Sequence, residues 1–240
     1  MVEYHDAEWG VPSHDDTHLF EHLSLEGFQA GLSWELVLRK REAMRRTFAG
    51  FDMARVAAFG DDTVAELLLE AGIVRNRLKI RSVIANARTA LDILKEHGSL
   101  DVYLWDLAGG KTVHNRWRRL AEVPASTPDS ERISKELMRR GFKFVGPTGV
   151  YAFMQSVGMV NDHLVTCPRR EALLTKPAQP HRRRYWPAAI FLYLSASAVF
   201  PSESSIWTRN CAPTWAYWPV GDASITAANR VSASALWPRL

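Results

Sequence analysis

Apolar residues recur at helical spacing through the first two thirds of the chain, and capping residues separate the runs. Before residue 168 no stretch alternates convincingly with the period of two that is typical of strands. The body is therefore predicted to be all-α. The expected helices cover Asp15 to about Gly27, Ser33–Phe48, Asp52–Phe59, about Asp62–Glu70, a long run that Gly98 ends, a segment capped by Ser99, and Thr127–Gly141.

The stretch Leu25–Trp34 stands between the first two of these helices. It holds Glu26 in mostly apolar surroundings, with glycines on both sides that leave room for a ligand or another backbone. Glu26 could cap the next helix, for which Ser33 is also a suitable N-cap. Alternatively, it is a desolvated carboxylate that faces a pocket, which is common at working sites.

A glycine- and proline-containing turn interrupts the helical pattern between Gly141 and Tyr151. The preceding helix ends there, and another helix is expected from about Thr148 to Val157. Such a hairpin presents backbone N–H groups and a helix N-terminus outward, which suits a phosphate, and Lys143 lies within it. DNA-backbone binding is one interpretation, although helix–turn–helix junctions with glycine are common.

Two other features have both a chemical and a structural interpretation. His163 and Cys167 are four residues apart and would share one face of a helix, as metal ligands must, or they are packed core residues. The basic residues between Arg39 and Arg46 indicate a solvated helix face, with phosphate contact as the alternative. The aromatic and polar stretch Tyr4–Pro12 is predicted to be an ordered loop.

Charge divides the chain unevenly. Residues 1–167 hold 21 Lys and Arg against 23 Asp and Glu, a net charge of −2, whereas residues 168–240 hold 9 against 3, a net charge of +6. The overall charge of +4 therefore says little about nucleic-acid binding by the body. Two cysteines and the lack of an obvious signal peptide favour a reducing cytoplasm.

The sequence after Cys167 differs in character from the body. Three consecutive arginines precede an apolar run at 186–200, which is shorter than the roughly 20 residues of a membrane span. No clear helix or strand period follows. We expect two parts, a folded body at 1–167 and an irregular, basic, tryptophan-rich tail at 168–240. A membrane anchor is the minority alternative for the apolar run.

Five blocks in the body resemble the DNA-3-methyladenine glycosylase I family of the helix-hairpin-helix glycosylases, in the order and spacing of that family. They are Tyr4–Pro12, Leu25–Trp34, Ala71–Arg75, Arg140–Gly146 and Val160–His163. The resemblance implies a monomeric enzyme that binds double-stranded alkylated DNA, flips N3-methyladenine out of the duplex and hydrolyses its N-glycosidic bond.

The same resemblance implies roles for individual residues. Glu26 becomes the base-binding carboxylate, Tyr4 and Trp34 the pocket aromatics, and Trp9 a nearby wall. Lys143 and Gly146 belong to the DNA-binding hairpin. His5, His163 and Cys167 correspond to ligands of a structural Zn²⁺.

Two departures from the family pattern modify these expectations, a shorter segment before the first block and a tail of 73 residues of unrelated composition after Cys167, where family members end soon after the final ligand. Family members carry about a dozen further residues before the first block, including a cysteine zinc ligand, so that one of the four ligands of a closed site is missing here. Asp162 lies near the place where many hairpin glycosylases carry a catalytic carboxylate, but it could also be a structural cap. A non-catalytic zinc- and DNA-binding remnant and a three-ligand zinc hydrolase are the alternatives.

Overall fold

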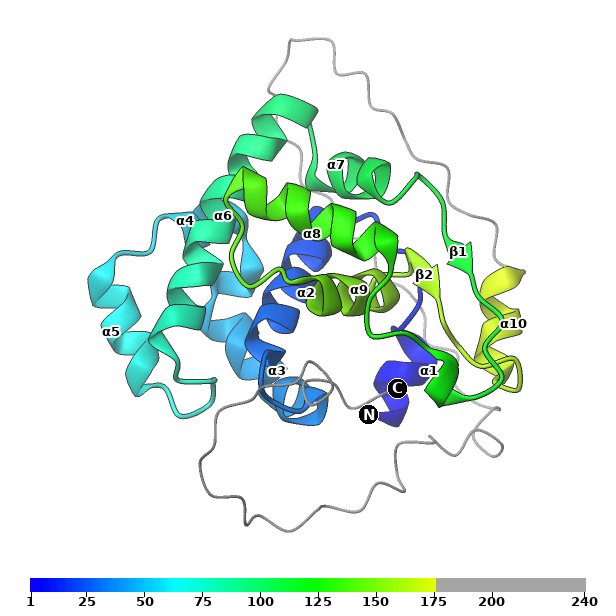
Figure 1. Cartoon of the computed structure of the whole chain (residues 1–240). Helices are drawn as coiled ribbons and strands as arrows, with labels where there is room; N and C mark the ends of the chain where they lie inside the picture. The colour runs from blue at the N-terminus through cyan, green and yellow to red at the C-terminus, as the bar shows by residue number, and fades with distance from the viewer. Residues whose placement is uncertain (176–240) are drawn as a thin grey trace, which may run out of the picture.

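The computed structural model describes residues 1–175 as a bundle of helices (Figure 1). The all-α prediction is confirmed, with one parallel pairing of two-residue strands, Val113 with Val160 and His114 with Asn161. The elements are α1 (Val2–Ala7), α2 (Asp16–Gln29), α3 (Trp34–Thr47), η1 (Ala49–Phe51), α4 (Met53–Ala57), α5 (Asp61–Leu69), α6 (Arg77–His97), α7 (Leu100–Leu107), β1 (Val113–His114), η2 (Leu120–Glu122), α8 (Pro128–Arg140), α9 (Pro147–Ser156), β2 (Val160–Asn161) and α10 (Pro168–Leu174).

Short-range capping chemistry sets most helix boundaries. The Ser33 side chain accepts a hydrogen bond from the Leu36 N–H, which confirms it as the N-cap of α3. Thr127 and Ser130 form a capping box around Pro128 at the start of α8. At the C-terminal end of α6, Gly98 adopts the left-handed conformation with φ of 83°. The helix predictions from these signals are confirmed to within a few residues.

Helix α2 lies in the middle of the helical bundle (Figure 1), and after its first turn it is buried. Every residue from Leu19 to Gln29 is buried, and the helix contacts α3, α6, α7 and α9. A helix enclosed in this way must bury its polar side chains together with its apolar ones. Burial of a polar group is unfavourable unless the group forms a hydrogen bond or ion pair within the protein or with a ligand.

Three local expectations are corrected. Tyr4–Pro12 is not entirely a loop, because α1 covers its first half. Helix α2 does not end at Gly27 but continues to Gln29, so Gly27 and Glu26 lie inside its last turns. Residues 162–167 are not helical, so the shared helical face predicted for His163 and Cys167 does not exist.

The expected domain boundary at Cys167 falls at the N-cap of α10. Seven residues of the segment predicted to be irregular thus form a helix, and its Arg170 and Leu173 are buried. The apolar run at 186–200 lies outside the described residues. Within residues 1–175, no helix is long and apolar enough to cross a membrane.

Close backbone packing attaches the segment after α1 to the end of the body. Gly158 has φ of 76°, and a Cβ at this position would lie 2.3 Å from the Pro12 nitrogen. Gly10 has φ of 79°, and a Cβ there would lie 2.9 Å from the Cε1 of His163. Only glycine combines this conformation with this approach, so the N-terminal segment is held in one position.

Candidate functional site

Glu26 is a buried carboxylate near the C-terminal end of α2, with 6% of its surface exposed. Its Oε2 atom has no hydrogen-bond partner among residues 1–175. Burial raises the pKa of Glu26 well above the usual 4.5, with no charged group acting against it. Ser33, and not Glu26, caps α3. A carboxylate in this setting is costly to the fold, which is typical of a functional group.

Two aromatic side chains predicted for the pocket lie together. The Tyr4 ring on α1 and the Trp34 ring at the start of α3 have centroids 5.6 Å apart. Burial raises the pKa of the Tyr4 hydroxyl, and the charge of Glu26 raises it further, which places Tyr4 within electrostatic range of that carboxylate. The structure thus brings the ring of Tyr4 against that of Trp34.

Trp9 has a different neighbourhood from the other predicted pocket residues. Its ring centroid lies 4.4 Å from that of His163 and 6.0 Å from that of His5. The described ring contacts of Trp9 therefore place it beside the predicted metal ligands. Its role as a wall of the base pocket stays a prediction.

The other acidic side chain of α2, Glu21, is fully compensated. The Arg41 Nε donates to Glu21 Oε1 at 2.8 Å, and the Arg45 Nε donates to the same oxygen at 2.6 Å. Both arginines belong to the run predicted to be a solvated face. That prediction is wrong for Arg41, which is buried in this network.

Glu8, just after α1, joins the same network. Arg41 donates to both of its oxygens, at 2.6 and 2.7 Å, and the Nε2 atoms of His22 and His18 lie 2.7 and 3.1 Å from Oε1. Burial would raise the pKa of Glu8, but the hydrogen bonds from both histidines and Arg41 hold it far below its usual value. Burial also lowers the pKa of His22 to about 4, so this imidazole is neutral at pH 7.

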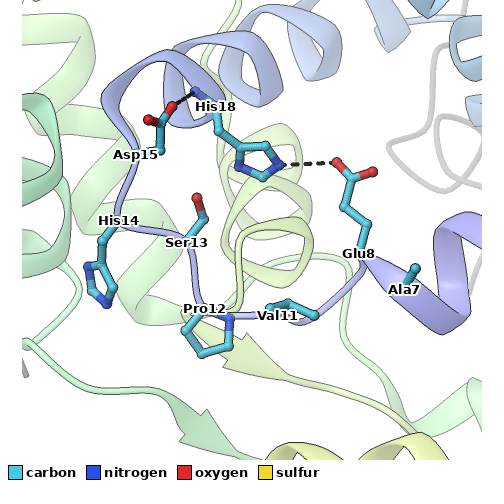
Figure 2. Close-up of a pocket in the computed structure, with 8 residues that line it drawn as sticks. All are labelled: Ala7, Glu8, Val11, Pro12, Ser13, His14, Asp15 and His18. Carbon is cyan, nitrogen blue, oxygen red and sulfur yellow. Dashed lines mark hydrogen bonds and ion pairs between the residues drawn. The ribbon is translucent and has the colours of Figure 1, made fainter. Parts of the chain in front are cut away.

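A pocket of about 420 Å³ is lined by Glu8, His18 and the segment between them (Figure 2). Figure 2 shows the Glu8–His18 contact at one side and the Asp15 side chain capping His18 at the other. Glu26, Tyr4 and Trp34 do not line it. Because Arg41 already compensates Glu8, the Glu8–His18–His22 cluster is an ion network that joins α1 to α2.

His5 on α1 converges with His163 and Cys167, which both lie in the non-helical segment after β2. One ligand atom from each lies within 4.8 Å of the other two. The His163 Nδ1 is 3.1 Å from the Asn161 Oδ1, which can only accept, so the proton is on Nδ1 and the buried Nε2 keeps its lone pair. That Nε2 has no hydrogen-bond partner within residues 1–175.

The His5 ring is oriented in the same manner. Its Nδ1 contacts the Asp6 carboxylate at 2.7 Å, and its Nε2 lies 3.7 Å from the Cys167 sulfur. Histidines that ligate metals commonly donate their second N–H to a carboxylate or an amide oxygen. The donor set and its orientation fit Zn²⁺, with three protein ligands.

Asp162 is occupied by structural hydrogen bonds. Its Oδ1 accepts from Asn115 and Trp117 at 2.7 and 2.8 Å, and its Oδ2 accepts from Tyr151 and Gln155 at 2.5 and 2.7 Å. Four donors saturate the carboxylate and attach the segment after β1 to α9. The structural interpretation of Asp162 is thus favoured over the catalytic one.

The predicted hairpin connects α8 to α9. Lys143 and Gly146 are exposed on it, whereas Phe142 and Val145 anchor it in the core. Gly146 is the N-cap of α9 and makes no side-chain cap. The exposed positions suit the DNA contact that the sequence predicts, which stays a prediction.

Two residues near Glu26 were not identified from the sequence. The Gln29 Nε2 is buried and has no partner in the described part of the chain. The Lys79 Nζ donates to the carbonyls of Phe28 and Ala30 at 2.8 and 2.5 Å and so caps the C-terminal end of α2. The sequence around Lys79 does not predict that this side chain caps α2, because the contact joins residues about 50 positions apart.

Comparison with known proteins agrees with this arrangement. The methyladenine glycosylase family model matches residues 1–170. DNA-3-methyladenine glycosylase 1 of Escherichia coli (strain K12) is 46% identical over 166 residues, which are 69% of this chain and 89% of that protein. DNA-3-methyladenine glycosylase of Haemophilus influenzae is 41% identical over 167 residues, 70% of this chain and 90% of that protein.

Solved structures show the same similarity. A crystal structure of 3-methyladenine DNA glycosylase I superposes with a TM-score of 0.68 at 46% identity and covers 69% of this chain and 91% of the other. A single-residue variant of a 3-methyladenine DNA glycosylase I, in complex with 3-methyladenine, has a TM-score of 0.69 at 32% identity and covers 70% and 91%.

The burial of Glu26 predicts a pH-dependent cost to stability. The raised pKa means that the folded chain binds this proton more tightly than the unfolded chain. The wild type is therefore favoured below the unfolded value of 4.5 and loses stability as pH rises through the folded pKa. Glu26→Gln should raise the free energy of unfolding at pH 8 by on the order of 2 kcal/mol, and this gain should vanish at low pH.

Urea unfolding of both proteins from pH 4 to 8 measures this difference. Glu35→Gln, at an exposed position on α3, is the matched control and should change stability little at any pH. A gain for Glu26→Gln that is equal at all pH values would show that burial of the charge is not its cause.

Proposed function

Because the chain belongs to the methyladenine glycosylase family and is a DNA glycosylase, we propose that it excises N3-methyladenine by holding the extruded base against Glu26, Tyr4 and Trp34. The substrate is alkylated double-stranded DNA, and the reaction is hydrolysis of the N-glycosidic bond.

The observation that carries the proposal is the buried Glu26, whose Oε2 has no hydrogen-bond partner among residues 1–175. The N3-methyladenine nucleotide is cationic, so a carboxylate without a protein counter-charge gains a partner when this base enters. Neutral adenine offers no such compensation. In a site screened from water the charge interaction is stronger than in solution, which favours the lesion over the normal base.

The aromatic rings contribute the second part of recognition. Electron-rich faces of Tyr4 and Trp34 attract a cationic base by about 0.5–2 kcal/mol through cation–π contact. Extrusion of a base from the duplex costs a few kcal/mol, and stacking of about 1–3 kcal/mol per base offsets part of it.

The chemistry of the leaving group reduces what the protein must supply. The alkylated base is already positively charged before the bond breaks, and it takes the bonding electron pair and leaves as neutral 3-methyladenine while positive charge develops on the sugar, so departure needs little protonation by a general acid. The saturated hydrogen bonding of Asp162 is consistent with a mechanism that requires no second carboxylate. Glu26 then acts by electrostatic stabilisation and orientation of the base.

A structural Zn²⁺ held by His5, His163 and Cys167 is part of the proposal. The buried lone pair of His163 Nε2 and the orientation of both imidazoles support it. The ion would join α1, which carries Tyr4, to the segment after β2. It would stabilise the pocket wall and would not take part in bond cleavage.

Glu26→Gln should abolish most of the activity while leaving the fold intact. Loss of the charge should lower the single-turnover rate of base release by roughly 10²–10³-fold, in the range found when a single electrostatic contact to a transition state is removed. The measurement is release of free N3-methyladenine from methylated DNA, with Glu35→Gln as the control at wild-type rate.

Unchanged release by Glu26→Gln would contradict the role assigned to this carboxylate. If the wild type binds DNA with the usual steep salt dependence but releases no base, the non-catalytic alternative holds instead.

Replacement of His163 by alanine should reduce bound zinc from about one ion per chain to nearly none and lower the melting temperature, because a structural metal contributes directly to folding. Metal analysis and thermal unfolding measure both effects. His18→Gln, which alters the other histidine-containing cluster, should retain the zinc. Equal zinc content and stability in His163→Ala and the wild type would remove this assignment.

A further inference from the structure

His22 is a fully buried histidine of α2 to which the function proposed above gives no task. It lies four positions before Glu26 and seven before Gln29, and side chains with this spacing share one side of a helix. Each of the three carries a buried polar atom that has no hydrogen-bond partner in residues 1–175. His22 therefore lies on the side of α2 that also carries the proposed base-binding carboxylate.

The His22 imidazole contacts both aromatic rings assigned to the pocket. Its centroid lies 6.3 Å from that of Tyr4, and the planes of these two rings are 16° apart. The centroid of Trp34 lies 6.4 Å away, with an angle of 38° between the planes. Tyr4 and Trp34 are themselves 5.6 Å apart, so the three rings are mutually in contact. A change at His22 is therefore felt by both pocket rings.

A hydrogen bond fixes the orientation of this imidazole. The His22 Nε2 lies 2.7 Å from the Oε1 of Glu8, and an ionised carboxylate can only accept, so the proton is on Nε2. Hydrogen bonds from His18, His22 and Arg41 keep Glu8 ionised, because they hold its pKa far below the usual value. Burial lowers the pKa of His22 to about 4, and the ring therefore brings no positive charge to a site for a cationic base.

The ion network around Glu8 does not by itself explain a histidine at position 22. Arg41 donates to both oxygens of Glu8, and the His18 Nε2 lies 3.1 Å from one of them. The Nδ1 of His22 has no partner among residues 1–175, and an unpaired buried polar atom is unfavourable to the fold. An apolar side chain would avoid this cost, whereas only a ring with a donor can be held by Glu8 while it packs against the two pocket rings.

We infer that His22 is a positioning residue that couples Glu8 to the rings of Tyr4 and Trp34 and holds these rings in the arrangement that receives the extruded base. The inference rests on the function proposed above. His22 acts through the two rings and not on the reacting atoms. Rings that are already ordered bind a base without the loss of side-chain freedom that ordering them on binding would cost.

His22→Gln tests this role, because it removes the ring but retains an amide that can donate to Glu8. The Kd for free 3-methyladenine should rise roughly 5- to 50-fold, a range that corresponds to the loss of two aromatic contacts. The single-turnover rate of base release from methylated DNA should fall by a similar factor. The Kd for an undamaged duplex should be unchanged, because His22 is fully buried.

Two further variants separate positioning of the rings from support of the fold. His18→Gln alters the other histidine beside Glu8, which contacts the His22 ring but has no described ring contact with Tyr4 or Trp34 within residues 1–175. It should bind 3-methyladenine with the affinity of the wild type. His22→Phe restores a flat ring without the donor and should recover part of the affinity that His22→Gln loses.

The melting temperature of each variant is measured beside the affinities. Wild-type affinity for 3-methyladenine in His22→Gln, or an equal loss in His18→Gln, would overturn the inference. A folded His22→Phe that binds no better than His22→Gln would also overturn it. A wild type that binds 3-methyladenine but releases no base from methylated DNA would overturn only the proposed function, since the binding comparison still decides the role of His22.

Discussion

The burial of α2 from Leu19 to Gln29 is the constraint on which the rest of the structure depends. Its buried polar side chains must be compensated by partners from other elements, and most are. Glu21 is paired with two arginines of α3, His22 is hydrogen bonded to Glu8, and the Ser24 hydroxyl donates to the Phe20 carbonyl. Glu26 stands in the same helix with one oxygen unpartnered among the described residues. Within one helix, Glu21 forms ion pairs that stabilise the fold, whereas Glu26 has an oxygen that a ligand can contact.

The surrounding contacts hold α1 in place beside α2. Glu8 joins the end of α1 to α2 and α3 through Arg41 and the two histidines, and α1 carries Tyr4. His5 on α1 meets His163 and Cys167 from the end of the body. Lys79 caps the opposite end of α2, just beyond Glu26. The aromatic ring of Tyr4 is thus positioned by two independent sets of long-range contacts, as a preorganised site requires.

The sequence predicts the parts of this fold that depend on local chemistry. Ser33, Thr127 and Gly98 act as caps through bonds to residues three or four positions away, so the helices they bound could be assigned in advance. The lack of a counter-charge at Glu26 could not be predicted, because it depends on whether a basic side chain from a distant segment of the chain packs beside it. Arg41 illustrates the difficulty, since its pattern indicated a solvated face and it in fact reaches Glu8, 33 positions away.

The central claim is that Glu26 is held without a compensating charge until a cationic base enters. A carboxyl-carbon NMR titration of the glutamates, with Glu26 assigned by comparison with Glu26→Gln, measures this directly in the absence of DNA. Glu26 should titrate well above the ordinary value of 4.5, in contrast to Glu21, which its arginines hold below that value. A midpoint for Glu26 at or below 4.5 would show that the carboxylate already has a partner and would contradict the account.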